Sequence, residues 1–140
     1  MIALAGYPRT AVQSKPVEER EMFAALNAAR RRAHLVPLVR DQLLDRVARE
    51  HARDMVQRQY FGHDSPDGAD PFDRMREAGV AFGYAGENLA MNADAQSAEA
   101  AFMHSSEHRA NILEPHYHRV GIATAGDPGE GEFFVQEFTD

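Results

Sequence analysis

The chain has 140 residues, 44% of them hydrophobic, which is enough for one folded domain with its own core. It contains no cysteine, so disulfides, thiolate zinc sites and cysteine nucleophiles are excluded. The net charge is −7, and residues 71–140 carry 12 acidic against 4 basic side chains, which argues against nucleic-acid binding. No apolar run is long enough to span a bilayer, so an integral membrane protein is not expected.

The first half of the chain predicts a leader and two helices. Residues 1–15 show no hydrophobic periodicity and are expected to be a flexible leader to a single domain over residues 16–140. Pro16 followed by glutamates is typical of a helix start, and apolar residues three or four apart continue this helix to about residue 33. Asp41 is expected to cap a second helix, which stops before Gly62.

The second half predicts two shorter helices and a hairpin. Asp70 is expected to begin a short helix closed by Gly79, and Asp94 to cap another helix. Residues 80–91 are apolar but interrupted by glycines, and we interpret them as irregular or extended. Residues 119–138 change to strand periodicity around a Gly/Pro-rich turn, which predicts a β-hairpin. Helices around a small antiparallel sheet make an α+β fold.

Histidines and isolated acids in glycine-rich segments are the side chains best able to do chemistry. His63 lies in F-G-H-D-S-P-D-G, Glu87 interrupts an apolar run in G-E-N-L-A, and His108 lies in S-S-E-H-R-A-N-I-L. A buried carboxylate is costly unless it is paired or faces a cleft. Two imidazoles and a carboxylate can hold a divalent metal ion or transfer protons. The alternative is structural: Glu87 caps backbone amides and the histidines are ordinary loop residues. The chemistry of these side chains alone favours neither interpretation over the other.

The same motifs stand in the order of a known family. The segments are residues 51–55, 61–68, 86–90, 105–113, 115–117, 120–122 and 135–138. From Glu19 to the C-terminus the chain closely resembles the bacterial SCP-like domains of the CAP superfamily (cysteine-rich secretory protein, antigen 5 and pathogenesis-related proteins). The resemblance implies a three-layer α-β-α sandwich with a small antiparallel sheet, and a location outside the cell or in the cell envelope.

The resemblance also implies a central cleft lined by two histidines and two acids. His63 matches the first histidine, Glu87 the first acid and His108 the second histidine. The position of the second acid falls on Ser105; the nearby Glu107 could substitute, but its side chain would leave the backbone in another direction. These five residues are therefore the expected cleft, with His63 and His108 as ligands of a divalent metal ion, zinc being the first choice.

Three nearby polar residues are expected to position the cleft rather than to bind a ligand. Asn88 follows Glu87 directly, and Arg109 and Asn111 follow the second cleft histidine closely enough to fasten its loop. His51 lies on the apolar stripe of the second helix and is expected to be a core histidine whose polar atoms are satisfied.

A different interpretation comes from residues 104–108, H-S-S-E-H, which match the inverted zinc-peptidase motif H-x-x-E-H. That motif requires His104 and His108 on the same face of one continuous helix. Two serines are poor helix formers, so Ser105 or Ser106 is expected instead to cap a new short helix.

Three functions are compatible with these residues. The first is a non-catalytic extracellular binding module that uses the cleft for a divalent metal ion and a nearby groove for a small apolar or envelope-derived ligand. The second is a metal-dependent hydrolase, a peptidase in which Glu87 activates water held by His63 and His108. The third is an interaction domain without a small ligand. The binding module is our first hypothesis, because the family resemblance favours it. No nucleophile, base and orienting group stand together in the sequence to support a covalent hydrolase.

Overall fold

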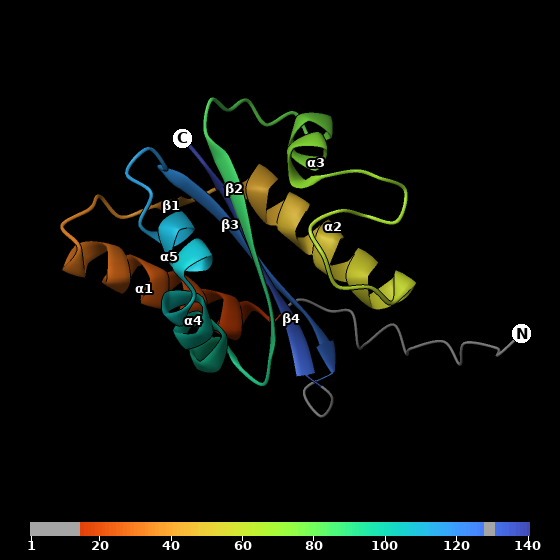
Figure 1. The fold of residues 1–140 in the computed structure, drawn as a ribbon, viewed down its shortest axis with the longest axis horizontal. Coiled ribbons are helices and arrows are strands. Elements are labelled where there is room, and N and C mark those ends of the chain that lie inside the picture. The colour runs from red at the N-terminus through yellow and green to blue at the C-terminus, as the bar shows by residue number, and fades with distance from the viewer. Residues whose placement is uncertain (1–14, 128–130) are drawn as a thin grey trace, which may run out of the picture.

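The computed structural model describes residues 15–127 and 131–140 (Figure 1). The described helices are α1 (Pro16–Arg32), α2 (Gln42–Arg58), α3 (Pro71–Glu77), α4 (Ala95–His104) and α5 (Ser106–Ile112). The described strands are β1 (Val39–Arg40), β2 (Ala85–Asn92), β3 (Arg119–Asp127) and β4 (Gly131–Thr139). All but the last residue of the predicted leader lies outside the described residues. No described helix has the length and apolar character needed to cross a membrane.

Side-chain caps begin three of the helices at the predicted residues. The Asp41 carboxylate accepts the Leu44 N–H at 2.9 Å at the start of α2, and the Asp94 carboxylate accepts the Ser97 N–H at 2.7 Å at the start of α4. Asp70 forms a reciprocal capping box at the start of α3. These bonds satisfy N–H groups that have no partner within the helix, so the starts are encoded locally.

The four strands form one sheet in the order β1-β3-β4-β2. The predicted hairpin is β3 and β4, and β2 pairs antiparallel with β4 over its whole length. Of the two alternatives predicted for residues 80–91, the extended one holds for most of the segment, because pairing with β4 orders it as β2. The sheet is mixed rather than purely antiparallel, since the two residues of β1 run parallel to β3.

Helices cover both faces of the sheet, as predicted for a three-layer α-β-α sandwich. In Figure 1, α1, α4 and α5 lie on one side of the strands and α2 and α3 on the other. The first side has a core of buried apolar residues that includes Leu26, Phe102, Ile122 and Phe134. On the other side, a Cβ on Gly121 of β3 would lie 2.1 Å from the backbone carbonyl carbon of Leu44, so glycine is required for α2 to approach the sheet.

A buried arginine fastens α1 to the segment around α5. The Arg30 side chain is 1% exposed, and its guanidinium donates to four backbone carbonyls. The acceptors are Val36, Ile112, Glu114 and Tyr117, at 2.8, 2.8, 3.0 and 3.3 Å. Burial lowers the pKa of Arg30. This clamp holds the end of α5 and the turn that follows it, and α5 carries one of the candidate site histidines.

Candidate functional site

Glu87 of β2 lies at the centre of a buried charged cluster. Its side chain is only 1% exposed, yet both carboxylate oxygens are bonded. Oε1 accepts from Nδ1 of His63 at 2.7 Å, and Oε2 accepts from Nη2 of Arg74 at 3.1 Å. Burial acts to raise the pKa of Glu87, but the hydrogen bonds and nearby positive charges outweigh it, so the pKa falls below its usual value. Glu87 is therefore a paired carboxylate held in a low-dielectric environment, not a free one.

His63 lies in the loop between α2 and α3, with its side chain 53% exposed. Because Nδ1 donates to the Glu87 carboxylate, Nε2 is the ring nitrogen left for a ligand. The hydrogen bond to Glu87 raises the pKa of His63, although partial burial opposes the shift. The loop is held in place by Arg74, which donates to the His63 carbonyl at 2.7 Å.

His51 of α2 lies beneath this pair and is buried, as predicted. Its Nε2 donates to the Gly62 carbonyl at 2.9 Å and lies 4.0 Å from Oε1 of Glu87. Burial lowers the pKa of His51, with the Glu87 charge opposing the shift. A neutral His51 thus fixes the backbone next to His63 and belongs to the support of the site.

Glu137 of β4 was not predicted as a site residue. The strand register places it directly opposite Glu87, and it is fully buried. No N–H among the described residues donates to either of its oxygens. Burial, followed by the Glu87 charge, raises the pKa of Glu137 well above its usual value. Glu137 is therefore a neutral acid whose O–H can donate to Glu87, which resolves an otherwise repulsive carboxylate pair.

Arg74 of α3 was also missed, because nothing in the sequence distinguishes it from Arg76 on the same short helix. Besides Glu87 and the His63 carbonyl, its guanidinium donates to Ser65 Oγ and to the Ala69 carbonyl, both at 3.1 Å. One side chain therefore fixes both ends of the 63–69 loop and neutralises the buried carboxylate.

Amide side chains on the other face of the sheet connect β2 to α5. Asn88 Nδ2 donates to the His108 carbonyl at 3.0 Å and to Gln136 Oε1 at 3.1 Å. Asn111 Nδ2 donates to the Glu87 carbonyl at 3.2 Å and to Asn88 Oδ1 at 2.9 Å. Asn88 and Asn111 therefore fasten β2 to α5, and their role in positioning the cleft stays a prediction.

His108 lies on α5 with its ring edge against Phe102, at a centroid distance of 5.1 Å. Burial lowers the pKa of His108, and the charge of His63 lowers it further. Glu107 is exposed on the same helix, and no side-chain hydrogen bond of Ser105 or Glu107 is present among the described residues. Arg109 donates to the Met103 carbonyl at 3.2 Å and so fastens α5 to the end of α4.

The H-x-x-E-H interpretation is wrong. α4 ends at His104, and Ser105 has an extended backbone (φ −96°, ψ 123°) as the N-cap of α5. His104 and His108 therefore stand on different helices and do not share a helical face.

The fold agrees with a comparison to known families. The sequence model of the CAP family, described as the cysteine-rich secretory protein family, matches residues 23–138. The chain belongs to the CAP family. It is 34% identical over 130 residues to the uncharacterized protein YkwD of Bacillus subtilis, covering 92% of this chain and 49% of that protein. The chain thus spans about half the length of this curated relative.

Solved structures with this fold include an extracellular protein containing an SCP domain from Bacillus anthracis. It is 31% identical, with a TM-score of 0.84 over 96% of this chain and 44% of that one. A more distant fold neighbour is the structure of NaASP2 with Zn²⁺. It is 12% identical, with a TM-score of 0.67 over 95% of this chain and 83% of that one. At that identity the likeness concerns the fold alone.

A pocket of about 450 Å³ opens beside the charged cluster of this CAP domain. Its lining combines apolar and polar side chains, namely His63, Asp64, Asp70, Pro71, Phe72, Ala85, Gly86, Glu87 and Asn111. His108 is not part of this lining. Phe72 is 37% exposed, so an aromatic surface lines the same pocket as His63.

The donor set for a metal ion is incomplete in the described part of the CAP domain. Residues 15–127 and 131–140 hold no group of three histidines or acids arranged around one point. Glu87 cannot become a ligand without giving up its bonds to His63 or Arg74. Its bond to Nδ1 is instead the contact that usually orients a metal-binding imidazole. The residues present therefore do not fit a metal site closed by protein ligands.

Proposed function

We propose that this CAP domain is an extracellular, non-catalytic binding module that takes a small ligand in the pocket beside His63. The apolar part of the ligand packs on Phe72 and Pro71, and its polar end bonds to Nε2 of His63. The observation that carries the proposal is that both carboxylate oxygens of Glu87 already accept hydrogen bonds, one from His63 and one from Arg74. His63 is therefore the group left to bind a ligand.

The pocket composition supports a ligand that is partly apolar. Ligand sites typically combine an apolar wall with a few fixed polar groups. Here Pro71, Phe72 and Ala85 form the wall, and the His63 ring supplies the hydrogen bond to the polar end of the ligand. A small molecule derived from the cell envelope, with a short apolar chain and a polar head, fits this arrangement. The extracellular location rests on the description of the Bacillus anthracis neighbour.

A divalent ion enters this proposal only as a weak ligand of His63 and His108. Two imidazoles leave at least two positions of a tetrahedral zinc ion to water. Binding requires neutral imidazole, so it weakens as the pH falls through the histidine pKa values. We expect saturable but weak zinc binding that His63→Ala abolishes and His116→Ala, at an exposed histidine, leaves unchanged.

The hydrolase hypothesis receives less support from the geometry. A general base must reach a water molecule in the site. Glu87 is 1% exposed, and both of its oxygens already accept hydrogen bonds. We expect no peptide hydrolysis that depends on this residue. Turnover of a peptide library by wild type that is lost in Glu87→Gln would replace the binding module with the hydrolase.

The binding proposal is tested with octanoate, which carries a seven-carbon apolar chain and a carboxylate head. Titration followed by ¹H–¹⁵N NMR should shift the amides of Phe72, Gly86 and Asn111 saturably. Phe72→Ala should weaken binding about tenfold, because it removes most of the apolar wall. Phe61→Ala is the matched control, since Phe61 is 46% exposed but does not line the pocket.

Equal effects of the two phenylalanine substitutions would indicate nonspecific adsorption and contradict the proposal. Absence of any saturable shift would favour the third hypothesis, an interaction domain without a small ligand.

A further inference from the structure

A buried acid on α4 is connected to the ligand pocket by a chain of amide side chains. Glu99 is 5% exposed, and its Oε2 accepts from Gln136 Nε2 at 2.9 Å. Gln136 Oε1 accepts from Asn88 Nδ2 at 3.1 Å, and Asn88 Oδ1 accepts from Asn111 Nδ2 at 2.9 Å. Asn111 lines the pocket beside His63. We call Glu99 and these three amides the amide relay, because hydrogen bonds lead through them from α4 to the pocket wall.

The direction of the bonds in the amide relay is fixed by a backbone carbonyl. Asn88 Nδ2 donates to the His108 carbonyl at 3.0 Å as well as to Gln136, so both of its hydrogens are used. Gln136 must therefore present its oxygen to Asn88 and its amide hydrogens to Glu99. If the Glu99 side chain turns away, Gln136 loses the partner that holds its amide group, and its bond to Asn88 is weakened.

Glu99 has too few partners for a buried carboxylate. Its Oε1 is buried and has no hydrogen-bond partner among the described residues. Burial raises the pKa of Glu99 to about 7, and the bond from Gln136 opposes the shift. A buried carboxylate is stable only with a counter-charge and further hydrogen bonds. Glu87, the buried acid on the other face of the sheet, has both from His63 and Arg74, and its pKa is lowered. Glu99 is therefore most stable as a neutral acid.

No charged neighbour balances Glu99 when it ionises. The helix α4 packs against α1, α5 and β2, and β4 supplies the bond to Glu99. Their buried or partly buried charged groups are Glu18, Glu19 and Arg30 of α1, His108 of α5, Glu87 of β2, and Glu132 and Glu137 of β4. Among the described residues, none of these groups contributes to the pKa shift of Glu99, which is set by burial and by Gln136. The ionised side chain is therefore stabilised by turning toward solvent.

We propose that Glu99 is a pH-dependent switch for the pocket wall. In its protonated form the amide relay is intact and holds Asn111 and α5 against β2. In its ionised form the Glu99 side chain turns away, Gln136 is released, and Asn111 loses its fixed position. The effect of the switch on ligand affinity rests on the binding function proposed above, whereas the switch itself does not.

The test follows the amide relay by NMR as a function of pH. In wild type, the Glu99 carboxyl ¹³C resonance and the side-chain amide resonances of Gln136 and Asn88 should titrate together with a midpoint near pH 7. In Glu99→Gln this amide titration should be lost, because the new side chain can still accept from Gln136 but cannot ionise. His108→Ala should keep the titration, which excludes the imidazole of α5 as its source.

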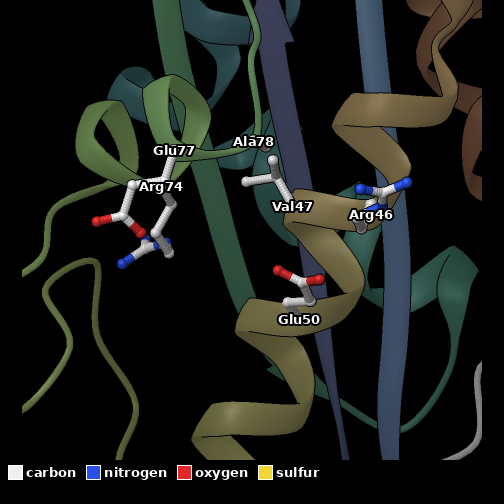
Figure 2. A pocket seen from close by; sticks show the side chains of 6 residues that line it. All are labelled: Arg46, Val47, Glu50, Arg74, Glu77 and Ala78. Carbon is white, nitrogen blue, oxygen red and sulfur yellow. The ribbon is translucent and has the colours of Figure 1, made fainter.

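Glu50→Gln is the matched control. Glu50 is an exposed acid on α2, beside the cavity between α2 and α3 shown in Figure 2, and α2 covers the other face of the sheet. This substitution should leave the amide titration unchanged. A titration near pH 7 that persists in Glu99→Gln, or amides that stay constant while Glu99 ionises, overturns the proposal.

Octanoate affinity gives the functional readout. At pH 8, one unit above the midpoint, about one molecule in ten keeps Glu99 protonated, so wild type should bind octanoate up to about tenfold more weakly than Glu99→Gln. At pH 6 the two proteins should bind nearly equally. His63 titrates in both proteins, so its contribution cancels in this comparison.

The outcomes separate the switch from the proposed function. Equal octanoate affinities at pH 8 would contradict the connection between Glu99 and the pocket. Absence of octanoate binding in both proteins would overturn the proposed function, while a titration of the amide relay that depends on Glu99 would still support the switch.

Discussion

The Arg30→Met variant should unfold at a much lower denaturant concentration than the wild-type domain does. Methionine keeps an unbranched apolar side chain of similar reach but removes all five N–H donors. Four backbone carbonyls then lose their partner at once, two of them from Ile112 and Glu114 at the end of α5. Two of these bonds, to Ile112 and Tyr117, are fully buried, and leaving a buried acceptor unsatisfied costs about 2 kcal/mol, so these two carbonyls give a loss of about 4 kcal/mol.

The measurement is urea unfolding followed by circular dichroism. With a slope of about 2 kcal/mol per molar urea, a loss of about 4 kcal/mol lowers the midpoint by about 2 M. Arg31→Met is the matched control: Arg31 is the next residue on α1, is exposed, and should change the midpoint by less than about 0.3 M. A midpoint for Arg30→Met within about 0.5 M of wild type would refute the view that this clamp stabilises the fold.

Three further substitutions test other parts of the structure. Burial raises the pKa of Glu99 from 4.5 to about 7, so its ionisation should lower the free energy of unfolding of the wild type by about 3 kcal/mol between pH 4.5 and 7.5. In Glu99→Gln this part of the loss should be absent when urea unfolding is measured over the same pH range, and an unchanged pH dependence would contradict the raised pKa. In Gly121→Ala the new methyl group clashes with the Leu44 backbone, so the melting temperature measured by calorimetry should be about 10 °C lower than that of wild type. An unchanged melting temperature would mean that α2 lies farther from the sheet. Glu87→Gln should lower the pKa of His63 toward 6.5 in an NMR titration, and a constant pKa would contradict the bond between them.

The elements predicted best are those encoded by neighbouring residues. Asp41, Asp70 and Asp94 each bond to N–H groups within the next few residues, so the helix starts could be read from short segments. The strand β2 could not, because its glycines and polar residues give no clear alternation. It is ordered by pairing with β4, which lies about 45 residues later in the chain.

The candidate site divides in the same way. His63 and Glu87 could be found from family motifs, and the structure brings them into contact. Arg74 and Glu137 could not, because their importance depends on distant partners. One signal for Glu137 was present. This strand has apolar side chains on both faces, Val135 on the same face as Glu137 and Phe134 and Phe138 on the opposite face. A strand with apolar residues on both faces is expected to be covered on both, which buries the acid as well. The roles assigned to His108, Ser105 and Glu107 stay predictions.

The order of the strands also bears on how copies of this protein behave at high concentration. An exposed sheet edge can pair with the edge of another molecule and start aggregation. One edge here is β1, which has only two residues and offers little backbone for such pairing. The other edge is β2, where the side chain of Asn111 already donates to the Glu87 carbonyl. An amide that helps to position the site thus also occupies part of the edge at which intermolecular pairing would begin.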